Sequence, residues 1–109
     1  MLDHEEFYRE SKIPELTMSG ITNFIHKGIM PGSFLGAVLE NNLKQTYGNA
    51  DENNLVAIPS IVQYLYNSCP GIAWGSAREV REWIEIGGLE GYSKGIRPKA
   101  QQEEEEDED

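Results

Sequence analysis

The sequence predicts an all-α protein, a compact small bundle of about four to five helices that forms a homo-oligomer. Apolar residues recur at spacings of three and four, Gly and Pro divide the chain into helix-length segments, and no stretch alternates as a strand does. With 109 residues, of which 39% are hydrophobic, the chain suits one small domain. Because so small a domain buries only a modest core, we expect copies to associate and any large binding site to lie between them.

The first expected helices lie on either side of Pro14. Residues 3–11 carry early acidic side chains, which favour a helix N-terminus, and Pro14 suits the first turn of the next helix. Gly28 provides a left-handed residue that ends this second helix, and a tight turn over residues 28–33 follows. A core helix is then expected from residue 34 to a stop at Gly48. The apolar residues that predict these helices are Leu16, Ile21, Phe24, Ile25, Phe34, Leu35, Val38, Leu39 and Leu43.

Two more helices are expected in the second half of the chain. Asp51 can cap a helix over residues 52–65, and Pro59 inside it predicts a kink or a break. Ser76 and Glu79 have the spacing of a capping box, and Gly87 and Gly88 end the helix that follows. The apolar residues that predict the first of these helices are Leu55, Ile58, Ile61, Val62 and Leu65, and Val80, Trp83 and Ile84 form the expected buried stripe of the second.

The acidity of the chain is concentrated at its C-terminus. The formal net charge is −10, and residues 103–109 hold seven acidic side chains and no basic one. Without those seven, twelve acidic residues stand against nine basic ones, a net charge of −3. We therefore assign residues 1–91 to the helical domain and residues 92–109 to a disordered tail, first basic and then acidic.

Composition argues against several classes of protein. The body lacks the clustered Lys and Arg that bind duplex nucleic acid, and no apolar run is long enough for a bilayer. The N-terminus does not resemble a signal peptide, so a cytoplasmic location is expected. Cys69 is the only cysteine, and neither His4 nor His26 has a metal-ligand neighbour. We expect no metal, no cofactor and no enzymatic activity.

The turn between the second and third helices is the first candidate binding site. A helix that begins after Pro31 offers free backbone N–H groups to an anion, and Gly32 lets the anion approach closely. The Ser33 hydroxyl can donate to the anion, Lys27 or His26 can supply positive charge, and Met30 completes the turn. The commoner use of such a turn is structural, with Ser33 as a helix cap and Lys27 as a solvated cation.

Aromatic residues give two further candidates. Tyr8, next to Phe7 and near Lys12, can stack on a nucleobase beside a cation, or it can simply anchor the N-terminal helix. Residues 64–67 and 74–76 flank a turn, and Ser76 opens a second helix N-terminus. For this last group a structural role is the favoured interpretation, with Trp74 in the core.

The order of motifs along the chain resembles that of a known family. These motifs span most of the folded part, from about Leu16 to Leu89, and together they are similar to the small phage proteins of the anti-CBASS cyclic-nucleotide sponge family. They occupy residues 28–35, 37–39, 41, 43, 50–53, 61–62, 65–67, 70, 74–76, 80, 83–84 and 87–89. The acidic tail departs from the family pattern.

The resemblance implies a bacteriophage protein of immune evasion that assembles as a homohexamer in the host cell cytoplasm. Such sponges bind cyclic dinucleotides, including cyclic GMP-AMP, in pockets shared between protomers, and some also bind cyclic trinucleotides. They sequester the ligand without cleaving it and so block host CBASS signalling. By this resemblance Tyr8 would stack on a base and Lys27 would contact the phosphates, with Lys12 as the competing candidate. The alternative is an acidic protein-interaction inhibitor, or polyanion mimic, of a host defence protein, and a structural phage protein without a ligand is a third possibility.

Overall fold

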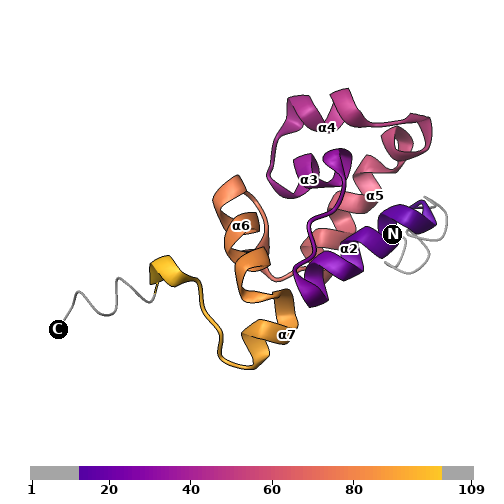
Figure 1. Cartoon of the computed structure of the whole chain (residues 1–109). Coiled ribbons are helices and arrows are strands. Elements are labelled where there is room, and N and C mark those ends of the chain that lie inside the picture. The colour runs from indigo at the N-terminus through magenta and orange to yellow at the C-terminus, as the bar shows by residue number, and fades with distance from the viewer. Residues whose placement is uncertain (1–12, 102–109) are drawn as a thin grey trace.

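This computed structural model describes residues 13–101, which form six α-helices, one 3-10 helix and a helical turn at residues 99–101 (Figure 1). No strand occurs in this range, so the predicted all-α class is confirmed. The expected helix over residues 3–11 and the acidic run 103–109 lie outside the described residues. In chain order the helices are α2 (Glu15–Lys27), α3 (Ser33–Leu39), α4 (Leu43–Asn49), α5 (Glu52–Ser68), η1 (Gly71–Ala73), α6 (Ala77–Ile86) and α7 (Gly88–Ser93).

Helix α2 begins one residue after its predicted start, at Glu15, and ends at Gly28 as predicted. Pro14 is its N-cap, and Gly28 ends it in the left-handed conformation with φ 66°. The Gly28 N–H donates to the Phe24 carbonyl at 3.0 Å, which satisfies one of the last carbonyls of the helix. Ile21, Phe24 and Ile25 form the buried face of α2.

The single core helix expected after residue 33 is wrong, because the chain turns at residues 40–42. Asn41 takes a left-handed φ of 61°, and the Asn42 side chain accepts from the Gln45 N–H at 3.2 Å, which caps a new helix. Asparagine tolerates the left-handed region and competes for backbone hydrogen bonds, so two in succession end one helix and start another. Leu43, expected in the core, is instead 71% exposed at the start of α4.

Helix α5 is continuous through Pro59, so the predicted break is absent. The Asp51 carboxylate caps the helix as expected, accepting from the Asn54 N–H at 2.8 Å. Pro59 is exposed and removes one hydrogen bond, to the carbonyl of Leu55, on the outer side of the helix. One lost bond on a solvated face does not end a 17-residue helix whose other face is buried.

The C-terminal part of the fold contains more structure than expected. Ser76 caps α6 by accepting from the Glu79 N–H at 3.2 Å, and Gly87 ends that helix as predicted. The buried stripe of α6 is Val80, Trp83 and Ile86, whereas Ile84 is half-buried. A further helix, α7, follows at once, which together with the split of the 34–47 segment explains why the helices outnumber the expected four to five. Beyond residue 91 the Ile96 N–H donates to Gly91 at 3.0 Å and Pro98 is buried, so the packed body extends to Pro98.

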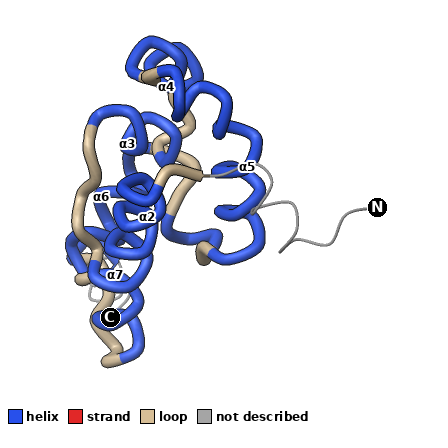
Figure 2. Tube along the Cα trace, turned by 90° about the vertical axis from the view of Figure 1, so that its right-hand side faces the viewer, coloured by secondary structure: helices blue, strands red, loops and turns tan. Residues whose placement is uncertain are grey.

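The end of α2 is where the helices meet. The Trp83 indole Nε1 donates to the Phe24 and Ile25 carbonyls at 3.0 and 3.2 Å, which links α6 to the last turn of α2. On the same turn, α7 begins against α2 with backbone almost touching backbone. A Cβ added at Gly88 would lie 2.4 Å from the Gly28 nitrogen, and one added at Gly28 would lie 2.6 Å from the Gly88 nitrogen. Figure 2 shows α2, α3, α6 and α7 grouped together, with α4 at the top and α5 along one edge.

We predict that Gly88→Ala destabilises the protein more than Gly87→Ala does. Both glycines have positive φ, so each alanine costs about 1 kcal/mol in backbone strain. Only Gly88 also faces backbone at short range, whereas nothing lies within 4 Å of a Cβ at Gly87. We expect Gly88→Ala to cost about 3 kcal/mol or more, measured by urea denaturation. Equal losses from the two substitutions would contradict the close approach of α2 and α7.

Candidate ligand-binding site

The turn between α2 and α3 is exposed and is not capped by a side chain. Gly32 is the N-cap of α3 with extended backbone, and Ser33 is the first residue of the helix rather than its cap. The structural role considered for Ser33, that of a capping hydroxyl, is therefore not the one it has. Met30, Gly32 and Ser33 are exposed and Pro31 is half-buried. The backbone of this turn is open to a ligand.

Four of the predicted site residues line one hollow. Met30, Pro31, Gly32 and Ser33 face α4 across an open hollow of about 420 Å³. The opposite wall carries side-chain amides, and the Asn49 amide donates to the Gln45 carbonyl at 2.9 Å. Such a wall can donate hydrogen bonds to, and accept them from, the polar edge of a ligand. The other polar residues of this wall are Glu40, Asn42 and Gln45.

One carboxylate limits what this hollow can bind. Glu40 is half-buried and brings a negative charge to the lining. Glu40 would repel an anion placed among the amides. An anion at the Gly32 end of the hollow would instead lie next to the exposed backbone of the turn. The hollow therefore suits a neutral, hydrogen-bonding part of a ligand better than a phosphate.

The remaining predicted residues are not brought to this hollow. His26 lines a separate hollow of about 400 Å³ with four residues from α7 and the loop after it, among them Glu90 and Lys94. Lys27 is exposed in the last turn of α2 and belongs to the lining of neither hollow. Tyr8 and Lys12 lie outside residues 13–101. The structure thus assembles the Met30–Ser33 part of the site and separates His26 from it.

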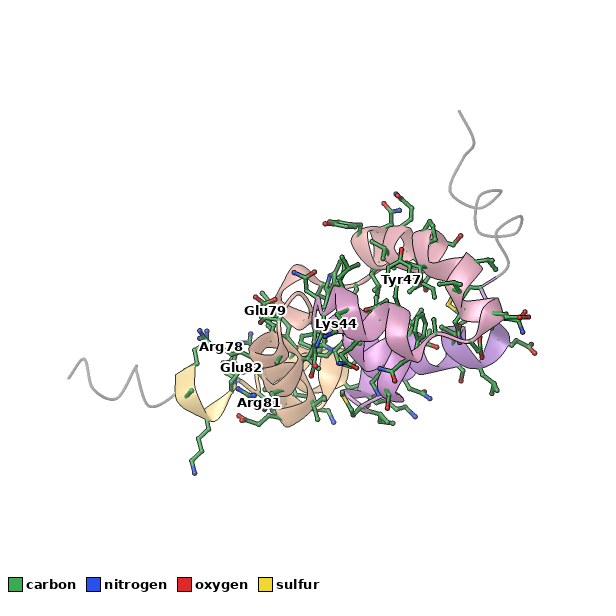
Figure 3. All side chains as sticks on the ribbon, turned by 90° about the horizontal axis from the view of Figure 1, so that it is seen from above. Lys44, Tyr47, Arg78, Glu79, Arg81 and Glu82 are labelled. Carbon is green, nitrogen blue, oxygen red and sulfur yellow. The ribbon has the colours of Figure 1, made fainter. Side chains whose placement is uncertain are left out.

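A further hollow, of about 480 Å³, was not predicted from the sequence. It lies between α6, η1 and the segment after α7, and its lining includes Ser76, Glu79 and Glu82. Its two arginines make contacts within the protein. Arg78 pairs with Glu82 at 3.1 Å, while Arg97 lies 3.8 Å from the centre of the Tyr92 ring. Figure 3 shows the labelled Arg78, Glu79, Arg81 and Glu82 together on α6. The hollow was not predicted because Arg97, one of its lining residues, was assigned to a disordered tail. The four-residue spacing of Arg78 and Glu82 was the one sequence feature that could have indicated an ion pair at this place.

The aromatic residues around the 69–71 turn pack against one another, but Trp74, which was expected in the core, is only half-buried at the side of it. The Tyr66 and Trp74 rings pack edge to face with centres 5.2 Å apart. The Gly75 N–H donates to the Leu39 carbonyl at 2.8 Å, which joins this turn to the end of α3. Since Ser76 caps α6, its hydroxyl already has a partner in the fold.

Neither a metal centre nor a membrane span is found in the described part of the chain. Residues 13–101 contain no group of three or more His, Cys, Asp or Glu placed to hold a metal ion. None of the helices in that range combines the length and the apolar character needed to cross a bilayer.

Cys69 is buried at the end of α5, and its burial raises the pKa of the thiol to about 12. Because the thiolate is the reactive form, we predict that Cys69 in the folded protein does not react with a disulfide reagent at pH 8. In urea the pKa falls toward its ordinary value and the thiol reacts fully. The raised pKa also contributes stability below the ordinary thiol pKa, and this contribution is lost as the pH rises through the folded value. Rapid labelling of the native chain would contradict the burial of Cys69.

No family model, curated protein or solved structure matches this chain.

Proposed function

We propose that this protein is a phage sponge, which binds cyclic oligonucleotide second messengers and holds them without cleaving them. Its ligands would be cyclic dinucleotides such as cyclic GMP-AMP, with cyclic trinucleotides as a second class, and its effect would be to block host CBASS signalling. The observation that carries the proposal is the uncapped turn whose residues Ile29, Met30, Gly32 and Ser33 are exposed, within the series of motifs that resembles the sponge family.

Phosphate recognition would use the backbone of this turn together with a nearby cation. Gly32 has no side chain to keep an anion away, and Ser33 offers both an N–H and a hydroxyl. Lys27 is exposed one turn earlier in the chain and can add a charge-assisted hydrogen bond. The amides beyond Glu40 would then contact a base or a ribose rather than a phosphate.

The size of the hollow supports a site shared between copies. At about 420 Å³ it is near the lower end of the roughly 300–1,000 Å³ found for ligand pockets, and it is open to solvent. A cyclic dinucleotide has two bases and two phosphates, so one protomer covers only part of it. In the proposed homohexamer a neighbouring protomer supplies the other wall, and Tyr8 supplies a ring on which a base stacks.

Titration calorimetry with a panel of cyclic dinucleotides and trinucleotides tests the proposal. We predict that at least one member binds the full chain with micromolar or better affinity and is recovered intact. Lys27→Ala should weaken that binding about tenfold to a hundredfold, the usual effect of losing one charge-assisted contact. Lys99→Ala is the matched control, since it removes an exposed lysine from the C-terminal segment and should leave the affinity unchanged.

The outcomes separate the function from the site. Absence of heat with every cyclic nucleotide would exclude the sponge function. Full-strength binding by Lys27→Ala would move the phosphate contact away from α2 and leave the function in place. Ligand cleavage during the titration would instead indicate an enzyme.

The seven acidic residues at 103–109 favour a second candidate function, in which the tail imitates a polyanion toward a basic host protein. Deletion of residues 102–109 distinguishes the two. We predict that the deletion leaves cyclic-nucleotide affinity within about twofold, because none of the proposed site residues belongs to the tail. A tail-dependent complex with a basic defence protein, together with no nucleotide binding, would support the mimic.

A further inference from the structure

Glu40 carries a carboxylate without a partner in the described part of the chain. It is half-buried in the lining of the hollow between the Met30–Ser33 turn and α4. Its backbone N–H donates to the Gly36 carbonyl, but its carboxylate forms no hydrogen bond or ion pair with any residue of 13–101. Glu40 is also the C-cap of α3, where the negative end of the helix dipole disfavours a negative charge. A residue that works against local stability in this way is typical of a functional site.

The side-chain amides near Glu40 are held so that N–H groups remain unused. The Asn42 Oδ1 accepts from the Gln45 backbone N–H, and the Gln45 Oε1 accepts from the Asn49 Nδ2 at 3.3 Å. With these oxygens occupied, the NH₂ groups of Asn42 and Gln45 make no hydrogen bond within residues 13–101. The buried Thr46 fixes the first turn of α4, because its hydroxyl donates to the Asn42 carbonyl at 2.8 Å. The hollow therefore offers a carboxylate as acceptor together with amide donors.

This set of groups matches the edge of guanine better than that of the other bases. Guanine has adjacent N–H donors at N1 and N2, from which one carboxylate can accept side by side, as it does from arginine. Its O6 and N7 are acceptors for amide N–H groups. Adenine and cytosine each place a ring nitrogen with a bare lone pair next to their amino group, and a carboxylate repels that lone pair. Uracil has a single N–H between two carbonyl oxygens, which the carboxylate also repels.

We propose that the hollow is a guanine site, in which the Glu40 carboxylate accepts from N1–H and N2–H of the base. The inference rests on the proposed function, because the base would belong to the cyclic nucleotide held at the turn. A guanidinium ligand would also pair with Glu40, but it has no acceptor for the NH₂ groups of Asn42 and Gln45. Guanine satisfies both kinds of group at once.

Calorimetric titration of the full chain with cyclic di-GMP, cyclic GMP-AMP and cyclic di-AMP tests the inference, since these ligands differ only in their bases. We expect the two that contain guanine to bind about tenfold to a hundredfold more tightly than cyclic di-AMP. Glu40→Gln should reduce this preference to about threefold or less, because the neutral amide loses the charge-assisted pair and can bond to adenine. Glu15→Gln is the matched control. Glu15 is exposed in the first turn of α2, at the opposite end of that helix from the hollow, so its loss should leave the preference unchanged.

Thermal unfolding of Glu40→Gln separates a ligand-binding role from a structural one. Because the substitution removes a charge that the end of α3 disfavours, we expect a melting temperature equal to or above that of the wild type. A clear fall in melting temperature would show that the carboxylate serves the fold, and it would contradict the inference.

A second measurement keeps this inference distinct from the sponge function. GMP and AMP carry the same phosphate, so at millimolar concentration only GMP should shift the side-chain amide signals of Asn42 and Gln45 in the nuclear magnetic resonance spectrum of the ¹⁵N-labelled chain. Cyclic nucleotides that bind without preferring guanine would overturn this inference and leave the proposed function in place. Shifts with GMP, but no binding of any cyclic nucleotide, would overturn the proposed function alone. Shifts with arginine and none with GMP would assign Glu40 to a guanidinium and exclude the guanine site.

Discussion

The fold depends on how closely the backbone of α7 approaches the end of α2. Gly28 and Gly88 both adopt left-handed conformations, and neither position has room for a Cβ. That approach lets α6 lie beside the same turn, where the Trp83 indole finds the carbonyls of Phe24 and Ile25. Since the indole N–H would otherwise be buried without a partner, its hydrogen bonds and the glycine contact stabilise the same arrangement. The exposed turn at Met30–Ser33 begins directly after this junction.

The position of the turn follows from that junction. Residues 24–28 are fixed by α6 and α7, so the chain leaves α2 in one direction and presents Met30–Ser33 toward α4. The chain reversal at Asn41 then brings the amide side chains of α4 to the other wall of the hollow. A ligand bound there would contact a surface held by buried packing on one side and a capped helix on the other. Preorganisation of this kind lowers the ordering cost of binding.

Much of the fold was predictable because its helix ends depend on local chemistry. Gly28, Asp51, Ser76 and Gly87 each end or cap a helix through contacts within four residues, and such contacts are visible in the sequence. The split between α3 and α4 was not predicted, because the apolar spacing continues through Asn41 and only the backbone conformation shows the stop. The packing of residues 94–98 was missed for a different reason, since a basic stretch beside an acidic run gives no sign of folding back.

Only part of the hollow could be predicted from the sequence. Met30–Ser33 are consecutive in the chain, so a correct turn brings them together without any long-range information. His26 is only a few residues away, but the helix directs it toward α7, and this direction depends on a helix that the sequence did not reveal. The position of Glu40 in the lining was not predicted either, because it depends on the break between α3 and α4. A continuous helix would not have brought α4 opposite the turn.

The two tryptophans of the chain are placed so that each responds to a different event. Trp83 is buried and hydrogen-bonded at the junction of α2, α6 and α7, so its fluorescence follows the integrity of the body. Trp74 is half-buried and packs against the exposed Tyr66 ring, so its fluorescence follows changes at this part of the surface. Replacing one tryptophan at a time by phenylalanine would therefore give two optical reporters, one for the folded core and one for the surface at Tyr66, without any attached label.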